Sequence, residues 1–185
     1  MSSLFEMDIF ILRLIYNNKV DLFDPILLFI TKSTYFIGIG IILYLGLFAF
    51  LKKQQYARNI FINLIFLLTV VTLIVLSLKY TVLRTRPFDL YPDIVNLSQA
   101  SSPSFPSGHT VIGFTLAFGL LFSRLKWFYC IPVFVWATSV AYSRLALGAH
   151  FPSDVFTSII IAFTVISMFK IVSSDKRVTN LMLRN

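Results

Sequence analysis

The feature that most constrains the fold is a series of apolar runs of membrane-spanning length, separated by short clusters of charged residues. The chain is 57% hydrophobic, contains 20 Phe and has a mean hydropathy of +0.83, values that do not fit an ordinary soluble domain. A run of about 20 apolar residues, rising about 1.5 Å per residue, crosses a hydrocarbon core of roughly 30 Å. We therefore predict an all-α integral membrane helical bundle, built as a single domain over residues 1–185.

About five transmembrane helices are predicted, covering residues 25–51, 57–78, 106–122, 127–144 and 152–171. A further apolar run at 4–18 is broken by Glu6, Asp8 and Arg13 and is too short to span. We interpret it as an N-terminal amphipathic helix lying at the interface, with a poorly formed sixth span as the alternative. Residues 80–106 form a long connection with little regular pattern, which we interpret as a functional lid.

The net charge of +8 is compatible with nucleic-acid binding, but the cations sit in short clusters between apolar runs. Membrane topology and an anionic lipid substrate explain that distribution better, so no nucleic-acid partner is expected. With five spans, one face carries nine of the 16 basic residues against only Asp175, whereas the other carries seven of the eight acids. The positive-inside rule makes the first face cytoplasmic. The nine basic residues are Lys52, Lys53, Arg58, Arg124, Lys126, Lys170, Lys176, Arg177 and Arg184.

Residues 143–154 place an Arg, a His and an Asp within an otherwise apolar region. Placing ionisable side chains within apolar, membrane-spanning sequence costs free energy, so such residues are functional candidates. Pro152 suits the first turn of a helix, so the carboxylate of Asp154 can reach the imidazole of His150. A carboxylate on one ring nitrogen leaves the other nitrogen free to attack an electrophile. From this stretch alone, an Arg144–Asp154 ion pair with an interfacial His150 is an equal alternative.

The predicted topology gathers several ionisable residues at the outer face, namely Lys79, Arg86, His109, Arg144, His150 and Asp154. Three crowded cations repel one another unless an anion is bound, and a phosphate monoester carries about −1.5 to −2 charges. Ser107 is a plausible N-cap, and the N–H groups of residues 107–109 would complete a phosphate cradle. No carboxylate cluster indicates a metal site, so neither metal nor cofactor is expected.

Three motifs in this region resemble the signature motifs of the type 2 phosphatidic acid phosphatase (PAP2) superfamily. They read Lys79-x6-Arg86-Pro87, Pro106-Ser107-Gly108-His109 and Ser143-Arg144-x5-His150-x3-Asp154. All three are complete and in the right order, whereas the first 78 residues match only in their pattern of spans. The superfamily also contains soluble acid phosphatases and vanadium haloperoxidases, and the spans favour its lipid phosphatases.

The resemblance implies a metal-independent, two-step hydrolysis. His150 would be the nucleophile that forms a phosphohistidine, and Asp154 would hold and polarise it. His109 would protonate the leaving oxygen and then activate water. The phosphoryl oxygens would be bound by Lys79, Arg86, Ser107, Gly108 and Arg144. The residues alone do not say which His attacks. Arg84 lies outside the signature, and we interpret it as a lipid-headgroup contact or a residue without a role.

The small size resembles bacterial members that act at the outer leaflet of the inner membrane on undecaprenyl pyrophosphate, phosphatidylglycerol phosphate or lipid A 1-phosphate. Several bacterial undecaprenyl pyrophosphatases carry Asp where this chain has Gly108. This difference favours a lipid phosphate monoesterase of broad selectivity, with lipid A among its substrates. The alternatives are a lipid-to-lipid phosphotransferase and a non-enzymatic lipid-phosphate binding or transport protein. The expected partners are the substrate lipid and the bilayer, with no obligate protein partner.

We expect phosphate release to persist in excess EDTA, because the motifs contain no set of metal ligands. The measurement is inorganic phosphate released from a lipid phosphate in detergent, with and without chelator. Loss of activity in EDTA that Mg²⁺ restores would contradict the metal-independent mechanism.

Overall fold

The computed structural model describes residues 2–101 and 103–182, with side chains described for 4–101 and 103–174. This part of the chain contains helices and no strand, which confirms the predicted all-α class. The helices are α1 (Ser2–Asn17), α2 (Asp24–Leu51), α3 (Gln55–Val82), α4 (Pro87–Leu90), α5 (Gly108–Phe122), α6 (Trp127–Ala146) and α7 (Pro152–Met182), and a 3₁₀ turn at Asp21–Phe23 precedes α2.

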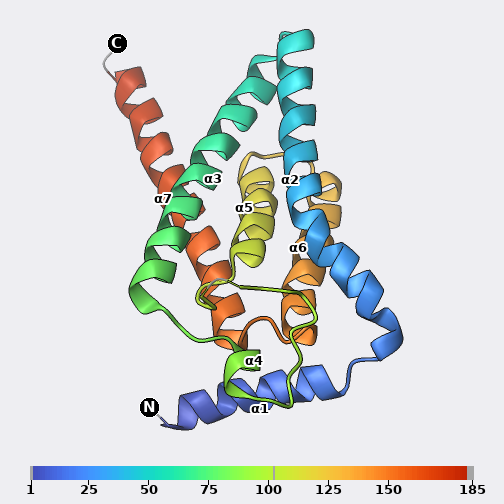
Figure 1. Ribbon diagram of the computed structural model, residues 1–185. Coiled ribbons are helices and arrows are strands. Elements are labelled where there is room, and N and C mark those ends of the chain that lie inside the picture. The colour runs from blue at the N-terminus through green and yellow to red at the C-terminus, as the bar shows by residue number, and fades with distance from the viewer. Residues whose placement is uncertain (1, 102, 183–185) are drawn as a thin grey trace.

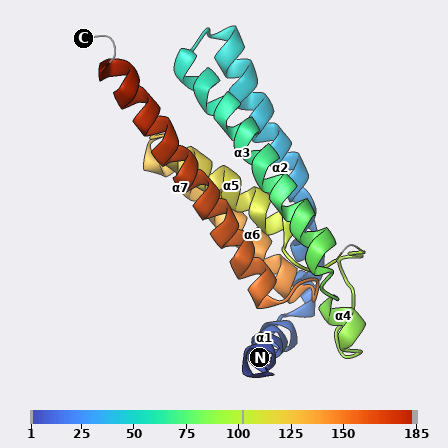
Figure 2. The ribbon, with the colours of Figure 1, turned by 90° about the vertical axis from the view of Figure 1, so that its left-hand side faces the viewer.

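Helix α5 is the centre of the bundle and packs against α2, α3, α6 and α7 (Figures 1 and 2). Small residues permit this close packing, as is usual between membrane helices. A Cβ on Gly113 would lie 3.3 Å from the Cβ of Ala137 in α6, and one on Gly119 would lie 2.4 Å from Leu64 in α3. Three of its neighbours, α2, α3 and α7, extend beyond the C-terminal end of the short α5 (Figure 1).

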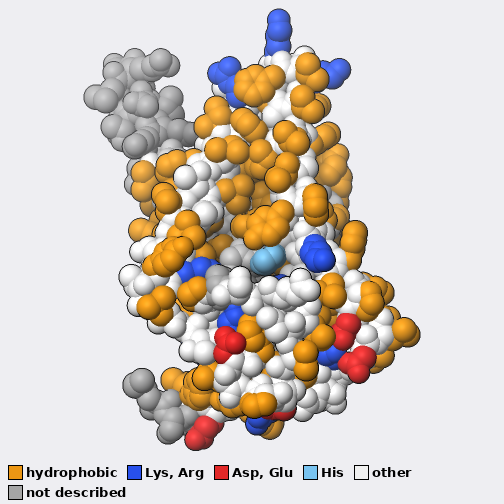
Figure 3. All heavy atoms as spheres, in the orientation of Figure 1, with side chains coloured by type: hydrophobic (Ala, Val, Ile, Leu, Met, Phe, Trp, Pro, Cys, Tyr) orange, Lys and Arg blue, Asp and Glu red, His pale blue; other side chains and the backbone are white. Residues whose placement is uncertain are grey.

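Three helical segments are long and apolar enough to cross a membrane, namely Asp21–Leu51, Gln55–Leu90 and Pro152–Ser174. Helix α5 is apolar but has only 15 residues, and α6 has 20 residues with Pro132 inside it. Passage of α5 and α6 through the bilayer therefore stays a prediction. Hydrophobic side chains cover much of the visible face; Lys and Arg appear at its upper end and again in its middle and lower parts, whereas the visible acids are confined to the lower part (Figure 3).

Helix α1 lies across the lower end of the bundle instead of running along it (Figure 1). It exposes apolar side chains such as Leu4 and Phe10 while burying Leu12 and Asp8. It is not among the segments suited to span a membrane. This placement is that of an interfacial amphipathic helix and not of a sixth span.

Two boundaries differ from the prediction. Helix α3 continues to Val82, and the short α4 interrupts the predicted irregular connection. Helix α7 runs to Met182, well past residue 171, because the polar residues that follow the apolar span continue the same helix. The side chains of Asp175, Lys176 and Arg177, and all of Arg184, lie outside the described residues.

Candidate active site

A cavity of about 260 Å³ lies at the end of the bundle nearest α1 and α4. It forms where the first turn of α5, the last turns of α3 and α6, and the loop at 98–101 converge. A His side chain is visible in a hollow beside basic side chains (Figure 3). The cavity is lined by Thr31, Lys32, Tyr35, Lys79, Arg86, Ser98, Gln99, Ala100, Ser101, Gly108, His109, Arg144 and His150.

His150 is held by a tight turn between α6 and α7. The backbone N–H groups of Ala149 and His150 both donate to the carbonyl oxygen of Arg144. Gly148 has a φ of 68°, a left-handed conformation that glycine adopts without strain. A Cβ at Gly148 would also lie 2.5 Å from the side chain of Ile94, so both the backbone and the space require glycine here.

The two ring nitrogens of His150 face different partners. Its Nδ1 lies 3.5 Å from Oδ2 of Asp154 and 3.5 Å from Oγ of Ser104, and that hydroxyl donates to the same carboxylate oxygen at 2.5 Å. Its Nε2 lies 3.4 Å from Nη1 of Arg86. Asp154 itself does not line the cavity, so it supports the imidazole from behind while Nε2 faces the cationic side.

Burial, together with the positive charges of Arg144 and Arg86, lowers the pKa of His150 to about 3 against the opposing effect of Asp154. The imidazole is therefore neutral around pH 7 and keeps a lone pair on one nitrogen. A neutral imidazole whose Nδ1 faces a carboxylate is chemically able to attack an electrophile through Nε2.

Three cations that were predicted from the motifs line the cavity. Arg86 is buried at the start of α4 and donates from Nη1 to the carbonyl oxygen of Ala149 at 2.6 Å. Lys79, in the last turn of α3, donates to the carbonyl oxygen of Pro103. Arg144 is buried in α6 and donates from Nη1 to Oγ1 of Thr31 at 2.7 Å. Each cation is therefore anchored to a different segment of the chain.

The Nε of Arg144 is buried and has no hydrogen-bond partner among the described residues. A buried donor without a partner is costly, and an anion in the cavity would satisfy it. His109, in the first turn of α5, shares the cavity and lies edge-on to the ring of Tyr35, with 5.1 Å between the ring centroids. The cavity thus combines cations with a second imidazole.

Among the predicted phosphate-binding residues, Ser107 is the one that does not line the cavity. It occupies the N-cap position of α5, but its side chain makes no capping bond. Its buried Oγ instead pairs with Oγ1 of Thr110 at 2.9 Å, and its N–H contacts the carbonyl oxygen of Asp154 at 3.4 Å. Gly108 and His109 do line the cavity at the N-terminus of α5, where helix N–H groups are available to anions.

The structure places Arg84 in a network of ion pairs that neither interpretation of the sequence anticipated. Its Nη1 donates to Oδ1 of Asp154 and to Oγ of Ser153, both at 2.6 Å. Its Nη2 donates to Oδ2 of Asp8 at 2.6 Å, and its guanidinium stacks 4.2 Å over the ring of Phe151. Arg84 is therefore the direct cationic partner of Asp154.

Asp8 extends this network to α1. Its Oδ1 accepts from the N–H of Ser153 at 2.8 Å, and its Oδ2 accepts from the Ser153 hydroxyl at 2.5 Å as well as from Arg84. The sequence drew attention to Asp8 only as an acid in an apolar helix. Lys32, in α2, is exposed and also lines the cavity.

A cationic cavity with two imidazoles, at one end of a membrane helical bundle, defines a membrane enzyme that handles phosphate groups. A comparison with known families matches residues 60–177 to the PAP2 superfamily. The chain belongs to this superfamily, which confirms the resemblance of its motifs, and its similar curated proteins are phosphatases.

Several individual proteins are similar to the chain. An undecaprenyl-diphosphatase from Sulfolobus acidocaldarius is 28% identical over 153 residues, covering 82% of this chain and 70% of that protein. Undecaprenyl-diphosphatase BcrC from Bacillus subtilis is 26% identical, covering 83% and 76%. Phosphatidylglycerophosphatase B from Escherichia coli is 38% identical over only 68 residues, covering 35% of this chain and 27% of that protein.

Two solved structures share the fold. The crystal structure of Aquifex aeolicus LpxE superposes with a TM-score of 0.71 and 31% identity, covering 86% of this chain and 92% of that one. The transmembrane PAP2-type phosphatidylglycerolphosphate phosphatase of Bacillus subtilis superposes with the same TM-score and 24% identity, covering 91% and 87%. The helical arrangement is therefore that of transmembrane PAP2 phosphatases.

Replacing Arg84 by Gln is expected to lower kcat about 10- to 100-fold, with KM within about twofold, because a misplaced Asp154 disturbs the imidazole without removing a phosphate contact. Asp8→Asn should have a smaller effect in the same direction, and Arg84→Lys should recover part of the activity. Steady-state kinetics on a soluble aryl phosphate would measure these changes.

The matched control is Arg13→Gln, because Arg13 also joins α1 to a loop through an ion pair, with Asp93, but both partners are exposed and neither lines the cavity. Arg13→Gln should keep wild-type kinetics. Wild-type kcat in folded Arg84→Gln, or equal losses in the control, would contradict a positioning role for Arg84.

Proposed function

We propose that the protein hydrolyses the phosphate of a membrane lipid, without a metal, through a phosphohistidine formed on His150. The single observation that carries this proposal is the neutral imidazole of His150, with Asp154 behind Nδ1 and Nε2 directed towards Arg86. Phosphate binding alone requires only the cations, whereas an imidazole held in this way suits nucleophilic attack.

In the first step Nε2 of His150 forms a bond to phosphorus while the bond from phosphorus to the lipid oxygen breaks. His109, protonated when the phosphate is bound, donates its proton to that oxygen. The leaving group is a neutral lipid alcohol for a monoester and a protonated lipid monophosphate for a pyrophosphate. The cations Lys79, Arg86 and Arg144, with the N-terminus of α5, stabilise the charge on the three remaining phosphoryl oxygens. The buried Nε of Arg144 gains the acceptor that it lacks among the described residues.

In the second step His109, now neutral, removes a proton from a water molecule that attacks the phosphohistidine. The phosphorus–nitrogen bond breaks, inorganic phosphate forms, and His150 returns to its neutral state. The same imidazole thus serves as acid and then as base, which restores both His residues after each turnover. Tyr35, packed edge-on against His109, fixes the ring at the cavity wall.

The cavity volume of about 260 Å³ accommodates a phosphoryl group and adjacent atoms, while the acyl or prenyl chains remain in the bilayer. Similar proteins are named for undecaprenyl diphosphate and for phosphatidylglycerophosphate. We propose a lipid phosphatase with broad selectivity among lipid A 1-phosphate, phosphatidylglycerol phosphate and undecaprenyl pyrophosphate, because selectivity rests mainly on the phosphoryl group.

The function is tested by measuring inorganic phosphate release from a panel of these three lipids with purified protein in detergent. Release from at least one lipid, lost in His150→Ala, is the expected result. Transfer of labelled phosphate to a second lipid without release would instead identify a phosphotransferase. Binding without either product would contradict catalysis.

The two His residues should differ when the leaving group needs no protonation. His150→Ala should lose about 10³-fold or more of its turnover on every substrate, because no covalent intermediate forms. His109→Ala should lose about 10²- to 10⁴-fold on a lipid phosphate. With p-nitrophenyl phosphate, the initial burst of p-nitrophenol should return in His109→Ala and stay absent in His150→Ala. A burst in His150→Ala alone would reverse the roles.

We propose that the catalytic cavity faces the extracytoplasmic side of the inner membrane, in accordance with the positive-inside rule. In a Cys130→Ala background, Asp93→Cys and Gln54→Cys place single thiols at opposite ends of the bundle. Both positions are exposed, whereas Cys130 is buried. An impermeant thiol reagent on intact cells should label position 93 and spare 54. The reverse pattern would place the cavity in the cytoplasm.

A further inference from the structure

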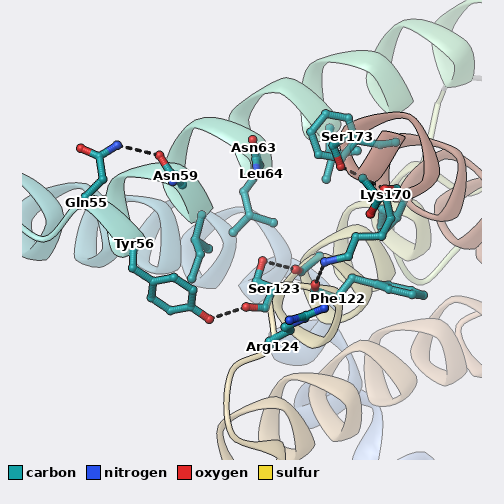
Figure 4. A pocket seen from close by; sticks show the side chains of 16 residues that line it. Gln55, Tyr56, Asn59, Asn63, Leu64, Phe122, Ser123, Arg124, Lys170 and Ser173 are labelled. Atoms are coloured by element: carbon teal, nitrogen blue, oxygen red, sulfur yellow. Dashed lines mark hydrogen bonds between the residues drawn. The ribbon is translucent and has the colours of Figure 1, made fainter. Parts of the chain in front are cut away.

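A second and larger cavity, of about 600 Å³, lies at the opposite end of the bundle from the catalytic one (Figure 4). It exists because α5 ends at Phe122, whereas α3 and α7 extend past that point and diverge (Figure 1). We call it the α3–α7 cleft. The residues that line it are Gln55, Tyr56, Asn59, Ile60, Asn63, Leu64, Leu67, Gly119, Phe122, Ser123, Arg124, Ile166, Phe169, Lys170, Ser173 and Ser174.

The lining of the α3–α7 cleft changes from polar to apolar along the bundle axis. The first turns of α3 contribute Gln55, Tyr56 and Asn59, whereas Leu64 and Leu67 lie further along the same helix. The lining residues of α7 and of the end of α5 follow the same order: their polar side chains lie towards the end of the bundle, and their apolar side chains lie towards its middle. A lipid molecule has the same order, from its headgroup to its chains.

The charge of the cleft favours an anion. Arg124 and Lys170 line it, and none of the lining residues whose side chains the structure describes is acidic. Lys170 is fixed beside the end of α5, because its Nζ donates to the carbonyl oxygen of Phe122 at 2.7 Å. A guanidinium binds two phosphate oxygens at once, and an ammonium adds a second charge.

The side chains of Arg124 and Asn63 are available to a ligand. Neither Arg124 nor Asn63 has a side-chain hydrogen-bond partner within the described part of the chain. Other polar groups of the lining are already engaged, since Gln55 donates to Asn59 and the Tyr56 hydroxyl donates to the Ser123 carbonyl oxygen (Figure 4). These contacts fix the cleft walls while Arg124 and Asn63 keep their bonding capacity.

We propose that the α3–α7 cleft binds the phosphate-bearing headgroup of an anionic phospholipid from the leaflet opposite the catalytic cavity. Arg124 and Lys170 bind the phosphate, Asn63 binds a headgroup or ester oxygen, and the first part of the chains lies against Leu64 and Leu67. The residues are distinct from those of the catalytic cavity, so the proposal stands whether or not the proposed hydrolysis is correct.

The test uses native mass spectrometry of the full chain in neutral detergent, with added phosphatidylglycerol or phosphatidylcholine. Phosphatidylglycerol is a phosphodiester and is therefore not consumed by a monoesterase. The wild type should retain phosphatidylglycerol in preference to phosphatidylcholine. The double variant Arg124→Gln/Asn63→Leu should bind it about tenfold more weakly, as expected for the loss of a charge-assisted hydrogen bond.

The matched control is Arg58→Gln, which removes a cation from the same end of the bundle but not from the cleft. It should bind the lipid within about twofold of the wild type, as should Lys79→Gln, which alters only the catalytic cavity. Phosphatase activity of the double variant in lipid-free detergent should also stay within about twofold, which separates this test from that of the proposed function.

Four outcomes would overturn the proposal. Unchanged binding in the double variant would place the lipid elsewhere, and equal losses in Arg58→Gln would reduce the effect to general surface charge. Loss of the lipid in Lys79→Gln would assign it to the catalytic cavity. Displacement of the lipid by millimolar inorganic phosphate would show that the cleft recognises free phosphate instead of a lipid.

Discussion

The structure depends above all on how the carboxylate of Asp154 is held away from solvent. It is completely buried, and burial of a carboxylate is costly unless hydrogen bonds and an opposite charge compensate it. Arg84 supplies the charge through Oδ1, and Ser104 with the N–H of Phe151 supplies hydrogen bonds to Oδ2. These contacts join the end of α3, the following loop and the start of α7, and Asp8 adds α1.

The cations on the other side of His150 present a different physical problem. Lys79, Arg86 and Arg144 are each anchored by a carbonyl or hydroxyl oxygen, but none of those oxygens carries a full charge. In the proposed mechanism a phosphate group adds negative charge between these cations, so substrate binding would relieve their mutual repulsion. Cations that are already anchored would then stabilise the transition state without large rearrangement.

The sequence predicted most of the fold because the hydropathy of membrane helices is locally determined: the span predicted at 25–51 is found as α2 at Asp24–Leu51. It also identified His109 and His150 through their motifs. It missed the link from Asp8 to Arg84, because these residues are 76 positions apart and neither periodicity nor motif spacing connects them. Phosphate binding by the Ser107 side chain stays a prediction, and the hydrogen bond between its hydroxyl and that of Thr110 does not favour it. A sequence motif does not show that a neighbouring hydroxyl competes for the same group.

The most direct test of the central claim is to trap the phosphoenzyme by rapid quenching with labelled substrate and to locate the phosphate by mass spectrometry. Because Nδ1 of His150 faces Asp154 and Ser104 while Nε2 faces Arg86, the expected product is a phosphohistidine at position 150 that is bonded through Nε2. Phosphate on His109, or on Nδ1 of His150, would contradict the assignment of His150 Nε2 as the nucleophile.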